Sequence, residues 1–499
     1  RLRACLFPYA TISATNTGMF KNALRNLNQA ASKTLRLADD TARLAVLSPY
    51  DRSLIDTLDY HSADDANTAL DRAVALYQDR SQWIPAHERM AILNRLGDLV
   101  EKASGSFAEL IAMEGGKPLR TAQIEVERAV FGIRHAASQI PAIMGSSSFT
   151  PDITPLGVGK HFDMRYEPIG PVVAICAFNH PLNLVVHQAA PAIAVGCPVI
   201  IKPDLRTPLC ALKFAKLARE AGLPEGWCET LICPNDIAEA LACDPRTAFL
   251  SFIGSAKVGW HLRSKIAPGT RCALEHGGTS PAILLPYADH DAAIPTLLRG
   301  GMTHAGQVCT SVQRVYVPWA EAGHIARKMG EAAEKLKVGN PLHEDTDVGP
   351  MITPEQVERV HRTVQDAIAR GAKLMCGGEK EADTLYKPTI LLDAPEDCAA
   401  VREEIFGPVI CVNGYEDVPH AIARANDSPY AFQAAVWGRS IDDVKRAVDQ
   451  LNFATVMVND HCAFRVDWMP FGGHKQSGLG VCGTAYTMRD YTRHKLVVS

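Results

Sequence analysis

The sequence predicts an α/β protein with two parallel-sheet domains. With 499 residues, the chain is too long for a single ordinary hydrophobic core, so more than one domain is expected. Between residues 172 and 275, and again from residue 281 onward, short apolar runs alternate with helical stretches. This alternation is typical of βαβ crossovers, and therefore of parallel sheets. Residues 162–167 and 491–498 are β-rich but fit neither series.

Composition narrows the functions that are open to the chain. Hydrophobic residues make up 47% and charged residues 21%, which is typical of a globular protein with an ample core. The formal net charge of −4 gives no basic field, so neither nucleic acid nor a membrane is expected as a partner. The 14 cysteines are scattered and form no Cys/His group with metal-ligand spacing. We therefore expect a cytoplasmic protein, in a reducing compartment and without a bound metal.

The N-terminal part is expected to be mostly helical. Residues 1–18 are predicted to lie outside the fold, as an upstream-derived or disordered segment, and residues 19 to about 47 show a helix-like pattern. Leu54–Leu58 is predicted to be a strand. Three amphipathic helices are then predicted, over Asp64–Gln78, His87–Ala103 and Gly105–Glu114.

The middle of the chain predicts the first sheet. Its apolar runs are Val172–Cys176, Val199–Ile201, Thr230–Ile232 and Phe249–Ile253. A helix is predicted over Thr207–Ala221, because Gly222 ends it. Ligands of open α/β sheets bind at the carboxyl ends of the strands. One ligand site is therefore expected around the residues that directly follow apolar runs, which are Asn179, Lys202, Gly254 and Glu275.

The second series predicts a second α/β domain that carries a cysteine loop. Its expected elements are strand Gln313–Val317, helices Ala320–Leu336 and Pro354–Arg370, and strand Val409–Val412. Cys309 follows a glycine-rich approach (Gly300, Gly301 and Gly306), and glycine lets a backbone come close to a ligand. Because this loop would face the strand ends of the first domain, the site is expected in the cleft between the domains.

Four motifs, spread along the chain, carry a resemblance to a known family. They are Ala177-Phe-Asn-His-Pro181, Ala273-Leu-Glu-His-Gly-Gly278, His304-Ala-Gly-Gln-Val-Cys309 and Glu403-Glu-Ile-Phe-Gly-Pro408. Further matches are Val199-Ile-Ile-Lys-Pro203, Phe252-Ile-Gly-Ser255, Val458-Asn459 and Pro470-Phe-Gly-Gly473. Together they resemble the aldehyde dehydrogenase superfamily, from about Ser48 to the C-terminus. The resemblance implies two Rossmann-like domains and an arm that pairs with a neighbouring subunit.

The resemblance also implies a reaction and its three central residues. Cys309 would attack an aldehyde, and the thiohemiacetal would become a thioester as hydride passes to NAD or NADP. Asn179 would donate a hydrogen bond to the oxyanion, and Glu275 would activate the water that releases a free carboxylic acid. Without the resemblance, Cys309 alone would favour a buried structural thiol, and Asn179 could be a turn asparagine. A surface glutamate is the alternative for Glu275, disfavoured by the apolar residues before it and the two glycines after it.

The cofactor residues follow from the same resemblance. Lys202 and Glu404 match residues that hold ribose hydroxyls, with Phe406 and Phe178 beside the nucleotide. The phosphates are expected at Gly254 and Ser255, which follow a strand and open a helix. Residues 478–483 also match the G-x-G-x-x-G fingerprint, but they follow no predicted strand, and a turn is expected there.

Leu205 stands where NAD-preferring relatives often carry a glutamate, and Arg206 follows it. Without the carboxylate there is less to repel a 2′-phosphate, and Arg206 would attract one. We therefore hypothesise use of NADP or of both cofactors. The alternative is a solvent-exposed Arg206 and a Leu205 that only packs against adenine.

The substrate is expected to be a small hydroxylated, carboxylated or otherwise polar aldehyde. The segment 463–470 resembles the substrate loop of such family members, so Arg465 would hold a carboxylate or phosphonate. The alternative is an arginine paired with Asp467. The other substrate candidates are His180, Val308, Thr310, Phe464 and Trp468, and Asn459 is expected to hold Glu275 or the nearby loops.

The predicted cofactor domain covers residues 19–157 and 169–281, with 471–485 returning to it. Residues 282–470 form the predicted catalytic domain, and residues 158–168 and 486–499 the arm, which implies a homodimer or homotetramer. Three other functions stay open: a cofactor-independent cysteine esterase or acyltransferase, a broad-specificity aldehyde dehydrogenase for apolar aldehydes, and a non-catalytic scaffold.

Overall fold

The computed structural model describes residues 43–499, so the predictions for residues 1–42 lie outside the described residues. The helix-like pattern expected up to residue 47 is wrong for Arg43–Leu47. This segment is a strand, β1, paired antiparallel with β2 (Leu54–Asp59). Val46 is buried while its neighbours Ala45 and Leu47 are more exposed, so the pairing with β2 and the burial of Val46 outweigh local helix preference.

The first large sheet has six strands in the order β19-β9-β8-β5-β6-β7. Their bounds are β5 Val172–Ile175, β6 Val199–Lys202, β7 Cys228–Thr230, β8 Phe249–Ile253, β9 Arg271–Glu275 and β19 Gly478–Leu479. Strands β5 to β9 are parallel, as predicted, and β19 joins the edge antiparallel. The strand expected at residues 230–232 lies two residues earlier than predicted, and β19 occupies part of the segment where a turn was expected.

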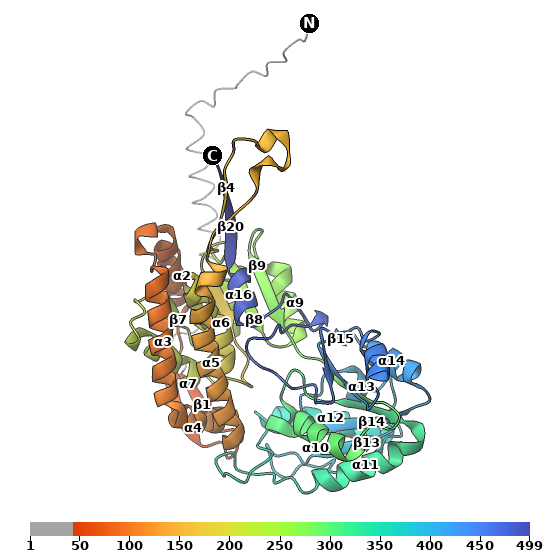
Figure 1. Cartoon of the computed structure of the whole chain (residues 1–499). Helices are drawn as coiled ribbons and strands as arrows, with labels where there is room; N and C mark the ends of the chain where they lie inside the picture. Colours follow the sequence, from red (N-terminus) through yellow and green to blue (C-terminus); the bar gives the residue numbers. More distant parts are fainter. Residues whose placement is uncertain (1–42) are drawn as a thin grey trace.

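Helices cover both faces of this sheet (Figure 1). Their bounds are α2 Ala63–Gln78, α3 Ala86–Lys102, α4 Ser104–Gly115, α5 Leu119–Ile143, α6 Asn183–Val195, α7 Leu209–Glu220, α8 Asn235–Cys243 and α9 Ala256–Lys265. Val172 and Ala174 pack against α3 to α7, whereas Val173 packs against α2 and α8. This follows from the alternation of side chains along a strand. The sequence predicts α2, α3, α4 and α7 but not α5.

The second large sheet has seven strands in the order β12-β13-β14-β11-β10-β16-β17. Their bounds are β10 Pro281–Leu284, β11 Arg314–Pro318, β12 Lys373–Cys376, β13 Thr389–Leu392, β14 Val409–Tyr415, β16 Gln433–Trp437 and β17 Thr455–Val458. Only β12 is antiparallel to its neighbour. The helices of this part are α10 His290–Met302, α11 Trp319–Ala333, α12 Pro354–Ala369, α13 Ala399–Arg402, α14 Val418–Asn426 and α15 Ile441–Val448.

A three-stranded antiparallel sheet projects from the body beside the first sheet (Figure 1). Its strands are β3 Ser147–Ser148, β4 Phe162–Pro168 and β20 Thr492–Val498. Strands β4 and β20 pair along their whole length, so the two β-rich segments that fit neither series lie side by side. Helix α16 (Thr484–Asp490) precedes β20, and β15 (Tyr430–Ala431) pairs with β18 (His474–Lys475). Among the described helices, none has the length and apolar character needed to cross a membrane.

Candidate active site

A cavity of about 1330 Å³ collects side chains from both large sheets and from helices α5 and α6. It is lined by nearly all of the residues predicted from the sequence, which are Cys309, Glu275, Asn179, Lys202, Gly254, Ser255, Glu404, Phe406, Arg206, Phe178, His180, Val308, Thr310, Phe464 and Arg465. Leu205 and Trp468 do not line it. The expectation that Trp468 lies on the tunnel wall is wrong, because its side chain turns outward and is 57% exposed.

The cysteine loop follows a short 3₁₀ turn, η4 (Thr303–Gly306). His304 and Ala305 in this turn have positive φ angles, and Gly306 follows with φ of +69°. A Cβ on Gly306 would lie 2.0 Å from the carbonyl oxygen of Gly407, so only glycine lets the two loops come this close. The turn therefore sets Cys309 against the loop that carries Glu404 and Phe406.

The thiol of Cys309 is protonated in the free protein at neutral pH. Burial, together with the negative charges of Glu275 and Glu404, raises the pKa of this thiol to about 12, while Arg465 opposes the shift. A thiolate is the reactive form of cysteine. The proton must therefore leave the sulfur when substrate or cofactor changes the surroundings of Cys309.

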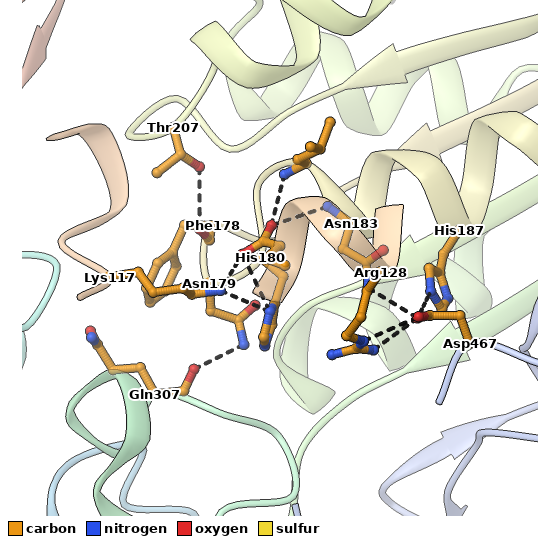
Figure 2. Close-up of polar contacts among 12 residues, drawn as sticks. Lys117, Arg128, Phe178, Asn179, His180, Asn183, His187, Thr207, Gln307 and Asp467 are labelled. Carbon is orange, nitrogen blue, oxygen red and sulfur yellow. Dashed lines mark hydrogen bonds and ion pairs between the residues drawn. The ribbon is translucent and has the colours of Figure 1, made fainter. Parts of the chain in front are cut away.

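Asn179 lies just beyond β5, and its side chain points to the cysteine loop (Figure 2). Its Nδ2 donates to the carbonyl oxygen of Gln307 at 2.9 Å, which uses one of the two amide hydrogens. Gln307 is itself anchored, because its side chain accepts from the Ile352 N–H and donates to the carbonyl oxygen of His304. Asn179 is thus fixed beside Cys309 with one donor left for a ligand.

Glu275 ends β9 and is buried against the edge strand β19. Burial raises the pKa of its carboxyl group, while Arg465 and the thiol of Cys482 oppose the shift. Its Oε1 has no hydrogen-bond partner among residues 43–499. Buried polar atoms usually have a partner, so this oxygen is available to a water or a ligand.

A second group of side chains lies where the carboxyl end of β6 meets the Glu404 loop. Lys202 Nζ donates to Asn235 Oδ1 at 3.2 Å. The carboxylate of Glu404 packs on Gly277, where a Cβ would lie 1.5 Å from Glu404 Oε1. Burial raises the pKa of Glu404 to about 7, and its Oε1 has no partner within residues 43–499. These groups fit a ribose, whose hydroxyls both donate and accept hydrogen bonds.

Arg206 is not a free cation. Its guanidinium forms a two-point pair with Asp204, with Nε–Oδ1 at 2.7 Å and Nη2–Oδ2 at 2.5 Å. It also stacks over the ring of Phe178 at 4.5 Å, and Phe178 meets Phe406 edge to face at 5.8 Å. Its charge is therefore compensated at the place where the sequence suggested an attraction for a 2′-phosphate.

Helix α5 supplies a buried ion pair that the sequence reading missed. Lys117, just before α5, pairs with Glu125, and Lys117 Nζ lies 2.8 Å from His180 Nδ1. Glu125 Oε1 also accepts the backbone N–H groups of Leu182 and Asn183 at 3.0 and 3.1 Å. Glu125 thereby ties the start of α6, and the Asn179 loop before it, to α5. A glutamate among the apolar positions of a helix was the available signal.

At the far end of the cavity, the lining residues Arg128 and Arg465 are linked to two buried groups behind the wall, Asp467 and His187. Asp467 pairs with Arg128 of α5 and His187 of α6, and Arg465 Nη2 lies 2.6 Å from His187 Nδ1. Arg465 also lies over the ring of Phe471, at 3.5 Å from its centre. Arg465 thus has no direct pair with Asp467, contrary to the alternative drawn from the sequence.

The expectation for Asn459 is wrong. Its Oδ1 accepts the Gly438 N–H at 2.9 Å and its Nδ2 donates to the Gly438 carbonyl oxygen at 3.2 Å. It therefore holds the segment just after β16, it has no hydrogen bond to Glu275, and it does not line the cavity.

Comparison with known proteins settles the family. The model of the aldehyde dehydrogenase family matches residues 37–497. The chain belongs to the aldehyde dehydrogenase family. The predictions of this family, of the two-domain α/β fold, and of an enzyme that oxidises aldehydes with NAD or NADP are therefore confirmed.

Relatives of this aldehyde dehydrogenase match nearly the whole chain. The 3-sulfolactaldehyde dehydrogenase of Priestia megaterium is 36% identical over 460 residues, which cover 91% of this chain and 94% of the relative. The lactaldehyde dehydrogenase of Methanocaldococcus jannaschii is 33% identical over 458 residues, covering 91% and 96%.

Solved structures of related enzymes have the same fold. Aldehyde dehydrogenase 21 of Physcomitrella patens, in complex with the reaction product succinate, has a TM-score of 0.87 at 32% identity, covering 93% of this chain and 96% of that one. The glyceraldehyde-3-phosphate dehydrogenase of Methanocaldococcus jannaschii, complexed with NADP, has a TM-score of 0.86 at 31% identity, covering 93% and 100%.

Proposed function

We propose that this aldehyde dehydrogenase converts a small anionic aldehyde to its carboxylic acid, with Cys309 as nucleophile, Asn179 as oxyanion donor and Glu275 as general base. One observation carries the proposal: these three side chains come from separate segments and line one cavity. A panel of short aldehydes, tested with NAD and with NADP by absorbance of the reduced nicotinamide, tests it. Turnover of no aldehyde with either cofactor would contradict it.

Each residue has one step in the proposed mechanism. The thiol of Cys309 first gives its proton to water, and the thiolate sulfur then adds to the aldehyde carbon. The oxygen that becomes negative accepts hydrogen bonds from the Asn179 amide and the Cys309 N–H. Bound NAD or NADP supplies the hydride acceptor. The resulting thioester is cleaved by water, whose proton passes to Glu275, and the carboxylic acid leaves as the thiol is restored. The buried, unpartnered Oε1 of Glu275 supports this last role.

The cofactor would lie between the ends of β6 and β8 and the Glu404 loop. Lys202 and Glu404 would hold the ribose hydroxyls, Phe406 and Phe178 would pack against the nucleotide, and Gly254 and Ser255 at the start of α9 would bind phosphate. We propose that both NAD and NADP are accepted. Leu205 brings no carboxylate to repel a 2′-phosphate, and the pairing of Arg206 with Asp204 leaves little attraction for one.

An anionic substrate is supported by the charges at the far end of the cavity. The side chain of Arg465 is half-buried, its Nε is buried without a partner within residues 43–499, and its only hydrogen bond to those residues is to the imidazole of His187. A buried cation without a hydrogen-bonded carboxylate is costly, and an anionic ligand removes that cost. His180, Val308, Thr310 and Phe464 would form the rest of the substrate wall.

We also propose the domain boundaries, the assembly and the compartment. Residues 19–157, 169–281 and 471–485 would form the cofactor domain, residues 282–470 the catalytic domain, and residues 158–168 and 486–499 the arm.

The open edges of the arm sheet, at β3 and β20, suit strand addition by a second copy in a homodimer or homotetramer. All cysteines of residues 43–499 are free thiols, which suits a reducing, cytoplasmic location. Light scattering at the elution peak of a sizing column tests the assembly.

A further inference from the structure

His187 and Asp467 form a buried pair that takes no part in the proposed bond-making steps. Both side chains are only 2% exposed. Asp467 accepts from His187 Nε2 at 2.7 Å, from Asn183 Nδ2 at 3.1 Å and from Arg128, whose Nη2 lies at 2.8 Å and Nε at 3.1 Å (Figure 2). One carboxylate thus organises side chains from α5, α6 and the 463–470 loop.

The hydrogen bonds leave only one tautomer for His187. A guanidinium can only donate, so Nδ1, which lies 2.6 Å from Arg465 Nη2, must carry a lone pair. A carboxylate can only accept, so Nε2, which faces Asp467, must carry the proton. Burial and the charge of Arg465 lower the pKa of His187 to about 4, which keeps the ring neutral near pH 7. The chain of hydrogen bonds therefore runs in one direction, from Arg465 through His187 to Asp467.

This chain fixes the guanidinium of Arg465 in orientation. The flat face of the guanidinium lies on the ring of Phe471, and its Nη2 is hydrogen-bonded to His187. Both the plane of the guanidinium and its rotation within that plane are therefore set. Its Nε–H is buried and has no partner among residues 43–499. Arg465 lines the same cavity as Cys309 and Glu275, whereas His187 does not line it. His187 therefore acts on a ligand only through Arg465.

The local charge is not balanced. Arg128 and Arg465 bring two positive charges, while Asp467 brings one negative charge and His187 none. Asp467 is fully occupied: burial alone would raise its pKa, but hydrogen bonds from His187 and the charge of Arg128 hold the pKa well below its ordinary range. Within this hydrogen-bonded group one positive charge is left, on Arg465, and the carboxyl group of Glu275 is the main negative charge that acts on it.

We propose that His187 is a positioning residue for substrate selection: the Asp467–His187–Arg465 chain holds the guanidinium at one angle, so that it binds the anionic group of the aldehyde while Cys309 reaches the carbonyl carbon. This inference rests on the proposed function and names the residue that sets its preference for an anionic substrate. A guanidinium that is free to rotate would still attract an anion, but it would not place the carbonyl at a fixed distance from the sulfur.

Two variants at one position test the proposal. The His187→Gln variant keeps one hydrogen-bond acceptor and one donor at this position. The His187→Phe variant keeps a planar ring but loses both hydrogen bonds. The probes are 4-oxobutanoate and butanal, which have equal carbon chains but differ in the terminal carboxylate. We expect His187→Phe to raise the ratio of the KM for 4-oxobutanoate to that for butanal by at least about tenfold, as expected for loss of a hydrogen bond that holds a charged group. His187→Gln should restore most of the change, and the exposed His87→Gln serves as the matched control.

The outcomes separate this inference from the proposed function. If the unaltered enzyme oxidises neither aldehyde with either cofactor, the proposed function fails. If it oxidises them but His187→Phe changes both KM values by the same factor, His187 is only structural and the inference is wrong. A measurement that needs no variant complements the kinetics: nitrogen NMR of histidine-labelled enzyme at pH 7.5 should show a neutral His187 protonated on Nε2. A ring protonated on Nδ1, or on both nitrogens, would overturn the proposal.

Discussion

The charged side chains at the proposed cofactor end of the cavity and those at its substrate end differ in how far they are hydrogen-bonded to other residues. At the cofactor end, Glu404 is buried with an oxygen that has no partner among residues 43–499, and within those residues the Lys202 amine makes one hydrogen bond, to Asn235. At the substrate end, Asp467, His187, Arg128 and Arg465 hydrogen-bond to one another. A ligand completes both arrangements, but the second is already ordered by its own hydrogen bonds, which leave the Nε of Arg465 without a partner among residues 43–499.

This difference has a functional meaning. A dinucleotide is large and offers many hydroxyls and phosphates, so its site can leave partners to the ligand. A short aldehyde offers few contacts, and its carbonyl must be held within reach of Cys309, which requires a rigid wall. Cys309, Asn179 and Glu275 lie between the two ends, and substitutions there should separate chemistry from binding.

The largest effect is expected for Cys309→Ala. Removal of the nucleophile should lower aldehyde oxidation by at least about 10⁴-fold. Binding of NAD or NADP, followed by quenching of protein fluorescence, should persist, because Lys202 and Glu404 are untouched. Retained oxidation would contradict the assignment of the nucleophile, and lost cofactor binding would show that the two ends are not independent.

Glu275→Gln should slow turnover by about 10²–10⁴-fold, because water in the thioester step loses its base. The same change should speed alkylation of Cys309 by iodoacetamide at pH 9. The negative charge of Glu275 raises the pKa of this thiol, so its removal lowers the pKa and increases the thiolate fraction.

The unaltered enzyme provides the reference for that experiment. Because the pKa of Cys309 lies near 12, its alkylation rate should rise with pH, by up to about tenfold per pH unit, between pH 7 and pH 10. Slower alkylation of Glu275→Gln would mean instead that Glu275 draws the proton from the sulfur.

Asn179→Ala should lower kcat by about 10²–10³-fold, with a smaller change in KM, because the amide stabilises charge that develops only on the oxyanion. Asn459→Ala is the matched control. This asparagine bonds only to Gly438 among the described residues and lies outside the cavity, so its loss should leave kcat within about twofold. Equal losses in both variants would point to misfolding rather than to an oxyanion site.

The smallest effect is expected from Leu205→Glu. A carboxylate near the adenosine ribose should repel a 2′-phosphate and accept a 2′-hydroxyl, which shifts the ratio of kcat/KM for NAD over NADP upward by about tenfold. Kinetics with both cofactors at several concentrations measure this ratio. An unchanged ratio would mean that Leu205 lies too far from the ribose to influence the choice.

Much of the first sheet was predictable because its strands are short, buried and bounded by polar residues. The runs at Val172–Ile175 and Phe249–Ile253 match β5 and β8 closely, and the residues just beyond such runs are the ones that line the cavity. Helix α5 was missed because Glu125 and Arg128 interrupt its apolar pattern. These charges face inward and are compensated by Lys117 and by Asp467, which the chain supplies from elsewhere.

By itself, the sequence predicted the alternation of strands and helices and the cysteine loop with its glycines, because each is recorded in neighbouring residues. It also predicted Cys309, Asn179 and Glu275 as catalytic candidates, through a family resemblance carried by several motifs along the chain. Only the tertiary structure decided that Asp467 meets His187 across 280 residues of chain, that Arg465 bonds to His187 rather than to Asp467, and that Arg206 is already paired. Local periodicity follows from backbone geometry and can be read in order. Which atoms form a buried hydrogen bond depends on how two distant segments pack together, and no local sequence pattern indicates that.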